Sequence, residues 1–147
     1  MARILTKRQA VAVIHKPRGV TTVKHSPGGT TVAKLDWNPD FSDYWSENYW
    51  AAQVWLDTQV LRLSAPYVPF LVGILEKSGT LGTVVGSGLV EYVTPYARYQ
   101  YYRPSQTARE LREGGMRGPM WFERMKTVHK NYLISGATER AGRGRGD

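Results

Sequence analysis

A long stretch of helical period, closed by two prolines, is the feature that most constrains how this chain folds. From Ser42 to Leu63, apolar and aromatic residues recur every three or four positions, at Trp45, Tyr49, Ala52, Leu56, Val60 and Leu63. This spacing predicts an amphipathic α-helix with one buried face. We expect Ser42 to cap the helix, and Pro66 and Pro69 to end it, because proline cannot continue a helix.

Several charged and aromatic residues of the same segment lie off the stripe. The charged ones are expected to lie mostly away from the core and are Asp43, Glu47, Asp57 and Arg62. Trp50 and Trp55 also lie off the stripe. They either pack on a neighbouring subunit or are buried beneath the N-terminal segment, and the sequence leaves both readings open.

Downstream of the helix, three short segments rich in Val, Thr and Tyr predict a small antiparallel sheet. They are Thr83–Ser87, Leu89–Thr94 and Ala97–Tyr101. The polar, glycine-containing segment from Arg103 to Gly118 then predicts a mobile loop.

A second helix is predicted from Pro119 to about Ser135. Proline suits the first turn of a helix, and a one-sided stripe follows it at Trp121, Met125, Val128 and Tyr132. Gly136 is expected to end this helix.

These elements predict an α+β domain in which a long helix packs on a small antiparallel sheet and a second, C-terminal helix closes it. With 147 residues, 41% of them hydrophobic, the chain is long enough for one such domain. We expect an extended basic arm at 1–34, the domain at 35–136 and a disordered tail rich in Gly and Arg at 137–147.

The N-terminal segment is the most basic part of a chain whose formal net charge is +8. Residues 1–34 contain seven Lys or Arg residues and no acid. β-branched residues predict strands in the segments Gln9–His15, Val20–Lys24 and Thr30–Trp37, with a turn at Ser26–Gly29. A flexible tail is the alternative.

The residue inventory argues against catalysis, and we expect no cofactor and no metal. The chain has no cysteine, and His15, His25 and His129 have no second ligand at a suitable spacing. The glycines from Gly79 to Gly88 lack a phosphate-binding motif and suit turns. Arg145–Asp147 matches a cell-adhesion tripeptide in letters only, because no export signal accompanies it.

No apolar run reaches the length of a membrane-spanning helix, so we expect no membrane partner and folding in a reducing cytoplasm. The positive charge favours non-specific contact with nucleic acid or acidic protein surfaces. Sequence-specific reading of bases is disfavoured, because Arg124, Lys126, Lys130 and Asn131 form only an ordinary basic helix face.

Three blocks of sequence resemble the minor capsid or neck proteins of tailed phages, which belong to the head-tail connector. The first is SAPYVPFLVGILEKSG, with Pro66, Tyr67, Pro69, Gly73, Leu75 and Ser78 at the motif positions. The second runs to PYARYQYY at Pro95–Tyr102, and the third is RGPMWFERMK, with Gly118, Trp121 and Phe122. The resemblance covers roughly residues 42–136.

The resemblance implies a structural virion protein that forms a homo-oligomeric ring at the head-tail interface of a siphophage-like particle, after assembly in the host cytoplasm. Six copies are favoured over twelve. The expected partners are the adjacent head-completion or connector proteins and the tail-terminator or tail-tube proteins, and phage DNA passing through the ring. The alternative is a basic, non-specific nucleic-acid-binding protein.

Two features depart from the family pattern. Val72 stands where the family has a polar residue, and the stretch from Leu71 to Leu75 is unusually apolar, which predicts heavier packing there. The basic arm is also absent from the pattern.

The aromatic residues of the central block predict where subunits meet. Read as a strand, Tyr99 and Tyr101 share one face and Arg98 and Tyr102 the other, so one face cannot bury all the rings. The rings either meet the next subunit or form the core and rim of one domain. The residues expected at the subunit interface are Trp50, Trp55, Tyr67, Tyr96, Arg98, Tyr99, Tyr101, Tyr102 and Trp121. Those expected to contact a neighbouring ring or DNA are Arg3, Lys7, Arg8, Lys16, Arg18 and Lys24.

Overall fold

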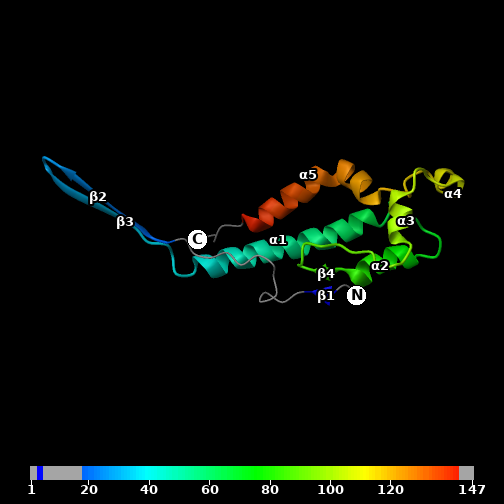
Figure 1. Ribbon diagram of the computed structural model, residues 1–147, viewed down its shortest axis with the longest axis horizontal. Helices are drawn as coiled ribbons and strands as arrows, with labels where there is room; N and C mark the ends of the chain where they lie inside the picture. Colours follow the sequence, from blue (N-terminus) through cyan, green and yellow to red (C-terminus); the bar gives the residue numbers. More distant parts are fainter. Residues whose placement is uncertain (1–2, 5–17, 143–147) are drawn as a thin grey trace.

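The computed structural model describes residues 3–4 and 18–142 of the chain, and it confirms the α+β class. The described helices are α1 (Phe41–Ser64), α2 (Ile74–Gly82), α3 (Ala97–Tyr102), α4 (Ala108–Arg112) and α5 (Trp121–Ala141). The described strands are β1 (Arg3–Ile4), β2 (Val20–Ser26), β3 (Gly29–Leu35) and β4 (Val84–Val85). The molecule is elongated, with the β2–β3 hairpin at one end and α2, α3 and α4 at the other (Figure 1).

Helix α1 confirms the predicted main helix and its end before Pro66. Its start differs, because Asp40 occupies the N-cap position and Ser42 lies inside the first turn. Asp57 was expected to lie off the core, yet it is only 3% exposed. Its carboxylate accepts hydrogen bonds from the side chain of Gln53 and from the backbone N–H groups of Gly86 and Gly88, at 2.7, 2.8 and 3.1 Å. The buried charge is thereby satisfied, and it holds the turn after β4 against α1.

Helix α5 runs antiparallel to α1 and forms its main packing partner (Figure 1). The predicted helix is confirmed, but it begins at Trp121 and not at Pro119, and Gly136 does not end it, because the helix continues to Ala141. The expected tail therefore begins five residues too early, and residues 143–147 lie outside the described part. The predicted stripe is correct for Trp121 and Met125, which are buried, whereas Val128 and Tyr132 are exposed.

Gly136 is a packing residue. A methyl group added to its Cα would lie 2.1 Å from Cη2 of Trp55, which is far too close for two non-bonded carbon atoms. The ring of Trp55 also lies 5.7 Å from that of Tyr132, and the guanidinium of Arg140 lies 4.3 Å from the Trp55 ring centroid. The two long helices thus approach closely because one of them has no side chain at this point.

The predicted antiparallel sheet lies elsewhere in the chain. Strands β2 and β3 form an antiparallel hairpin, which confirms two of the strands expected in the arm and the turn between them. The segment Leu89–Thr94 is not a strand, and Ala97–Tyr102 is helix α3. Within the predicted strand Thr83–Ser87 only β4 forms, and it pairs in parallel with β1. The strand expected at Gln9–His15 lies outside the described residues.

We predict that Gly136→Ala lowers the free energy of unfolding by about 1–3 kcal/mol, because the new methyl group overlaps the rigid indole of Trp55. At a helix position with free space, alanine stabilises the protein relative to glycine by about 1 kcal/mol. A loss of stability would therefore point to the overlap with Trp55. Urea unfolding followed by circular dichroism measures it. Ser135→Ala, at the exposed neighbouring position, serves as the control and should be neutral or slightly stabilising. A Gly136→Ala protein as stable as the wild type would contradict the packing of α1 on α5.

Candidate interaction surfaces

The three sequence blocks that carry the family resemblance meet in one hydrophobic core. Its buried members come from all three blocks and are Val68, Leu75, Ala97 and Trp121. Tyr67, Tyr92, Tyr101 and Phe122 pack around them. Residues separated by more than fifty positions are thereby brought together at one end of α1. We call this group the core cluster.

Trp121 lies at the centre of the core cluster. Its ring meets Tyr101 edge-on at 4.6 Å between centroids, and Tyr92 at 5.3 Å. Burial raises the pKa of Tyr92 to about 12 and also raises the pKa of Tyr101, because a phenolate is poorly solvated there. Trp121 itself is only 3% exposed.

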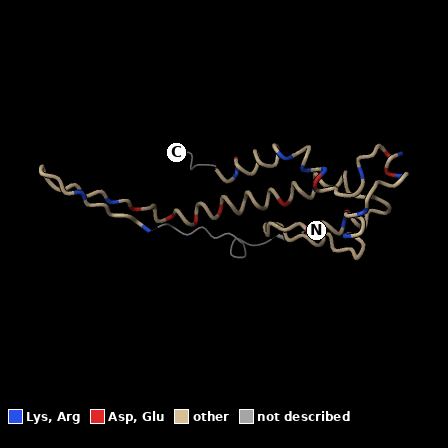
Figure 2. The backbone as a smooth tube through the Cα atoms, turned by 45° about the horizontal axis from the view of Figure 1, so that its top comes forward, with Lys and Arg blue, Asp and Glu red and all other residues tan. Residues whose placement is uncertain are grey.

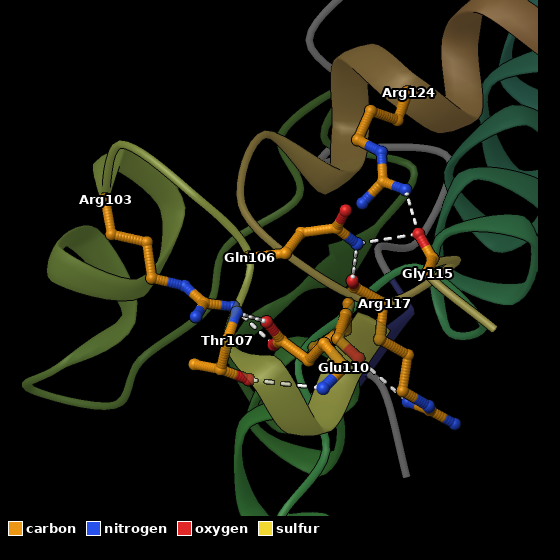
Figure 3. Close-up of polar contacts among 8 residues, drawn as sticks. Arg103, Gln106, Thr107, Glu110, Gly115, Arg117 and Arg124 are labelled. Atoms are coloured by element: carbon orange, nitrogen blue, oxygen red, sulfur yellow. Dashed lines mark hydrogen bonds and ion pairs between the residues drawn. The ribbon is translucent and has the colours of Figure 1, made fainter. Parts of the chain in front are cut away.

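The segment from Arg103 to Gly118 was expected to be a mobile loop, but it contains α4 and a set of polar contacts (Figure 3). Thr107 and Glu110 form a reciprocal capping box at the start of α4. Glu110 also pairs with Arg103, and both side chains are more than nine-tenths buried. These contacts fix how the chain leaves α3.

A second group of polar contacts ties the end of this segment to the core cluster. The amide of Gln106 donates to the carbonyl oxygens of Gly115 and Arg117 (Figure 3). Arg124 of α5 donates to the same Gly115 oxygen at 2.6 Å. Arg117 in turn donates to the carbonyl of Val68 at 2.8 Å. Backbone acceptors of two loops are thus satisfied by side chains from the neighbouring segments.

The surface of this end is unusually apolar. The stretch from Leu71 to Leu75 was expected to pack heavily, but Leu75 is the one large apolar residue of it that is buried. Leu71, Val72 and Ile74 are 74%, 64% and 55% exposed. Together with Tyr96 they line a groove of about 390 Å³ that reaches Arg103 and Glu110. On the next helix, Tyr99 and Tyr102 are 72% and 69% exposed.

These exposed rings are arranged by a helix and not by a strand. Because Ala97–Tyr102 is helical, Tyr99 and Tyr102 lie three positions apart on one side, whereas Tyr101 faces the core cluster. The alternation expected from a strand was therefore wrong. The β-propensity of tyrosine was overridden because a helix brings Ala97 and Tyr101 to the core cluster and turns Tyr99 outward, whereas a strand would place all three on one face.

The residues predicted at the interface fall into two groups. Tyr96, Arg98, Tyr99 and Tyr102 are exposed and available to a neighbour. Trp50, Trp55, Tyr67 and Tyr101 are half-buried, and Trp121 is 3% exposed. Trp121 is thus a core residue of the domain, and we no longer expect it at an interface. The indole of Trp55 packs against α5, as the burial alternative required, although its cover is a helix and not the arm.

Of the basic residues predicted to contact a ring or DNA, only some fall in the described part of the chain. Arg18 is exposed just before β2, and Lys24 is exposed on β2. The backbone of Arg3 pairs with that of Val84. Lys7, Arg8 and Lys16 lie outside the described residues.

Across residues 3–4 and 18–142, no group of three or more His, Cys, Asp or Glu side chains is placed to hold a metal ion. No helix of this part is long and apolar enough to cross a membrane. No protein-family model, curated protein or solved structure matches the chain. The proposals below therefore depend on the geometry and on the motifs themselves.

We predict that Glu110→Gln lowers the free energy of unfolding by up to about 3 kcal/mol at neutral pH, because it leaves the buried Arg103 charge without its counter-charge. Burial by itself raises the pKa of Glu110, but hydrogen bonds from the Thr107 backbone and from Arg103 outweigh it and bring the pKa below the usual 4.5. The stabilisation is therefore complete above pH 4.5 and is lost as the pH falls through the lowered pKa.

Urea unfolding over a range of pH tests this. The difference in stability between wild type and Glu110→Gln should shrink in acid. Glu113→Gln is the matched control, since Glu113, the residue just after α4, forms an exposed pair with Arg109 and should matter little. Equal effects of the two substitutions would show that the Arg103–Glu110 pair does not hold the segment.

Proposed function

We propose that this protein is a structural, non-enzymatic subunit of the tailed-phage neck. In this role several copies form a ring that joins the portal connector to the tail and lines or completes the DNA channel. The proposal extends the resemblance of three motif blocks, and it gains support because those blocks pack into one core cluster.

The observation that carries the proposal is the amount of apolar surface that a single copy leaves uncovered. Among the described residues, eight hydrophobic residues are buried, whereas twenty-one large hydrophobic residues are exposed. They gather on the α2–α3 end, on α5 and on the β2–β3 hairpin. A protein that works as a monomer rarely exposes apolar patches on this scale, whereas a subunit of an assembly covers them with its neighbours.

We predict that the purified protein forms a closed ring, with a mass of six copies favoured. Analytical ultracentrifugation gives the mass and negative-stain microscopy the shape. Substituting Tyr99 and Tyr102 together by serine should shift the protein to smaller species without loss of helical signal, because both side chains are exposed. The double variant Lys130→Ser, Asn131→Ser on α5 is the control. A protein that stays monomeric at high concentration would contradict the proposal.

A nucleic-acid-binding protein is the second candidate, favoured by the formal charge of +8 and by the exposed Arg18 and Lys24. The two functions differ in which part of the chain binds DNA.

Two variants with equal loss of charge separate them. Replacing six arm cations by glutamine removes six charges, and replacing six exposed cations of the helical body removes the same number. The arm set is Arg3, Lys7, Arg8, Lys16, Arg18 and Lys24, and the body set is Arg62, Lys77, Arg98, Arg109, Arg112 and Lys130.

For a neck protein whose arm binds protein, we expect the arm and body variants to lower DNA affinity alike and only modestly. For a nucleic-acid-binding protein, the arm variant alone should lose affinity. The slope of log affinity against log salt should then fall by about 0.9 for each phosphate contact removed. Fluorescence anisotropy with a labelled duplex at several salt concentrations separates the two results.

A further inference from the structure

A row of aromatic rings in edge and tilted contact begins just before α1 and runs along its first turns. Trp37, Phe41, Trp45 and Tyr49 follow one another at intervals of four residues, and neighbouring ring centroids lie 5.1, 6.2 and 6.3 Å apart. Intervals of four place them on one side of the helix. We call this row the aromatic ladder.

The aromatic ladder continues into an open groove between the two long helices. Trp45, Tyr49 and Ala52 line it from α1, and Ala137 and Ala141 line it from the end of α5, around a volume of about 430 Å³. Tyr49 is 47% exposed. Helix α5 ends here, so the first turns of α1 extend beyond its cover (Figure 1). The predicted stripe of α1 is thus buried along only part of its length.

The β2–β3 hairpin is the second unpartnered element. All fourteen of its residues are exposed, on both faces. The strand register places Val20 opposite Leu35 on one face, and Val23 opposite Val32 on the other. Two-stranded hairpins are marginally stable alone in water and are stabilised when a face packs on another element. Each face here carries an apolar cross-strand pair suited to that contact.

Charge links these two elements. Residues 35–61 contain five acids and no Lys or Arg. Four of the acids are exposed near the aromatic ladder, namely Asp36, Asp40, Asp43 and Glu47. The hairpin carries Lys24 and Lys34, and Arg18 precedes it. Basic residues on the hairpin and acidic residues on α1 are visible in Figure 2. The two surfaces are therefore complementary in sign.

The hairpin does not cover the aromatic ladder of its own chain. It leaves the start of α1 and projects away from both long helices (Figures 1 and 2). Only residues 36–40 separate β3 from α1. A second copy carries the same hairpin and can present it from outside.

We propose that the β2–β3 hairpin of one copy docks on the aromatic ladder and groove of another copy. The inference rests on the proposed ring and names the surfaces that close it. The face with Val23 and Val32 lies on the rings, and the basic side chains of the hairpin lie near the acids that flank them. Because Lys34 already pairs with Asp36 of its own chain at 2.8 Å, Arg18 and Lys24 supply the positive charge. The contact joins two different surfaces of one chain, as ring closure requires. The same acids disfavour nucleic acid as the occupant, because they repel phosphate.

The chain has no cysteine, so single cysteines introduced in pairs test the contact without background. One protein carries Val32→Cys on the hairpin and a second carries Thr138→Cys, at an exposed position beside the groove. The two are mixed and treated with a short bismaleimide. Any bond between the two cysteines then joins two copies. The control pair combines Val32→Cys with Leu111→Cys, an exposed position on α4 at the opposite end of the molecule.

We expect the Val32–Thr138 pair to give a cross-linked dimer several times stronger than the control pair. The yield should fall when Trp45→Ala is added to the groove partner, and it should fall with rising salt. If rings form without this cross-link, or with cross-links only between hairpins, the docking is overturned but the proposed ring is not. A monomeric protein would overturn both. Cross-linking that appears only after a DNA duplex is added would overturn the docking in favour of nucleic acid.

Discussion

The contact between Trp55 and Gly136 is the constraint on which the rest of the structure depends. It allows α5 to lie close against α1, and α5 in turn carries Trp121 into the core cluster. The loop before α2 and helix α3 pack around Trp121. The polar contacts of Gln106, Glu110 and Arg117 then hold the segment between α3 and α5 in position. The interior is small, because few hydrophobic side chains reach it. Each close approach between helices therefore matters more than it would in a larger domain.

Much of the fold could be predicted from local sequence pattern. The period of α1 and the proline after it are local signals, and so are the β-branched residues and the glycine turn of the hairpin. Failures occurred where distant residues decide the structure. Tyrosine-rich Ala97–Tyr102 is helical because of what it packs against, and Gly136 lies inside a helix because Trp55 occupies the space beside it. Asp57 has the charge of a surface residue, and its burial is explained by hydrogen bonds from the side chain of Gln53 and from the N–H groups of Gly86 and Gly88.

The surfaces were harder to predict than the helices. The motif residues suggested an interface, yet several of them, Trp121 above all, form the hydrophobic core of the domain itself. Leu71 and Val72 were predicted to pack because they are apolar, but the turn leading into α2 points them outward. Aromatic residues at intervals of four along α1 were visible in the sequence. The sequence pattern did not predict how far α5 extends along α1. That length leaves the first rings of the aromatic ladder uncovered by α5.

The placement of Lys24 and Lys34 has a consequence for the chain before it meets any partner. A hairpin with two open edges offers unpaired backbone groups to any other strand, and such edges promote indiscriminate aggregation. Each strand of this hairpin carries one lysine, at positions that do not face each other. Sheets that stacked edge to edge would bring these ammonium groups into desolvated, repelling positions. The same two side chains thus disfavour edge-to-edge pairing between hairpins of different copies.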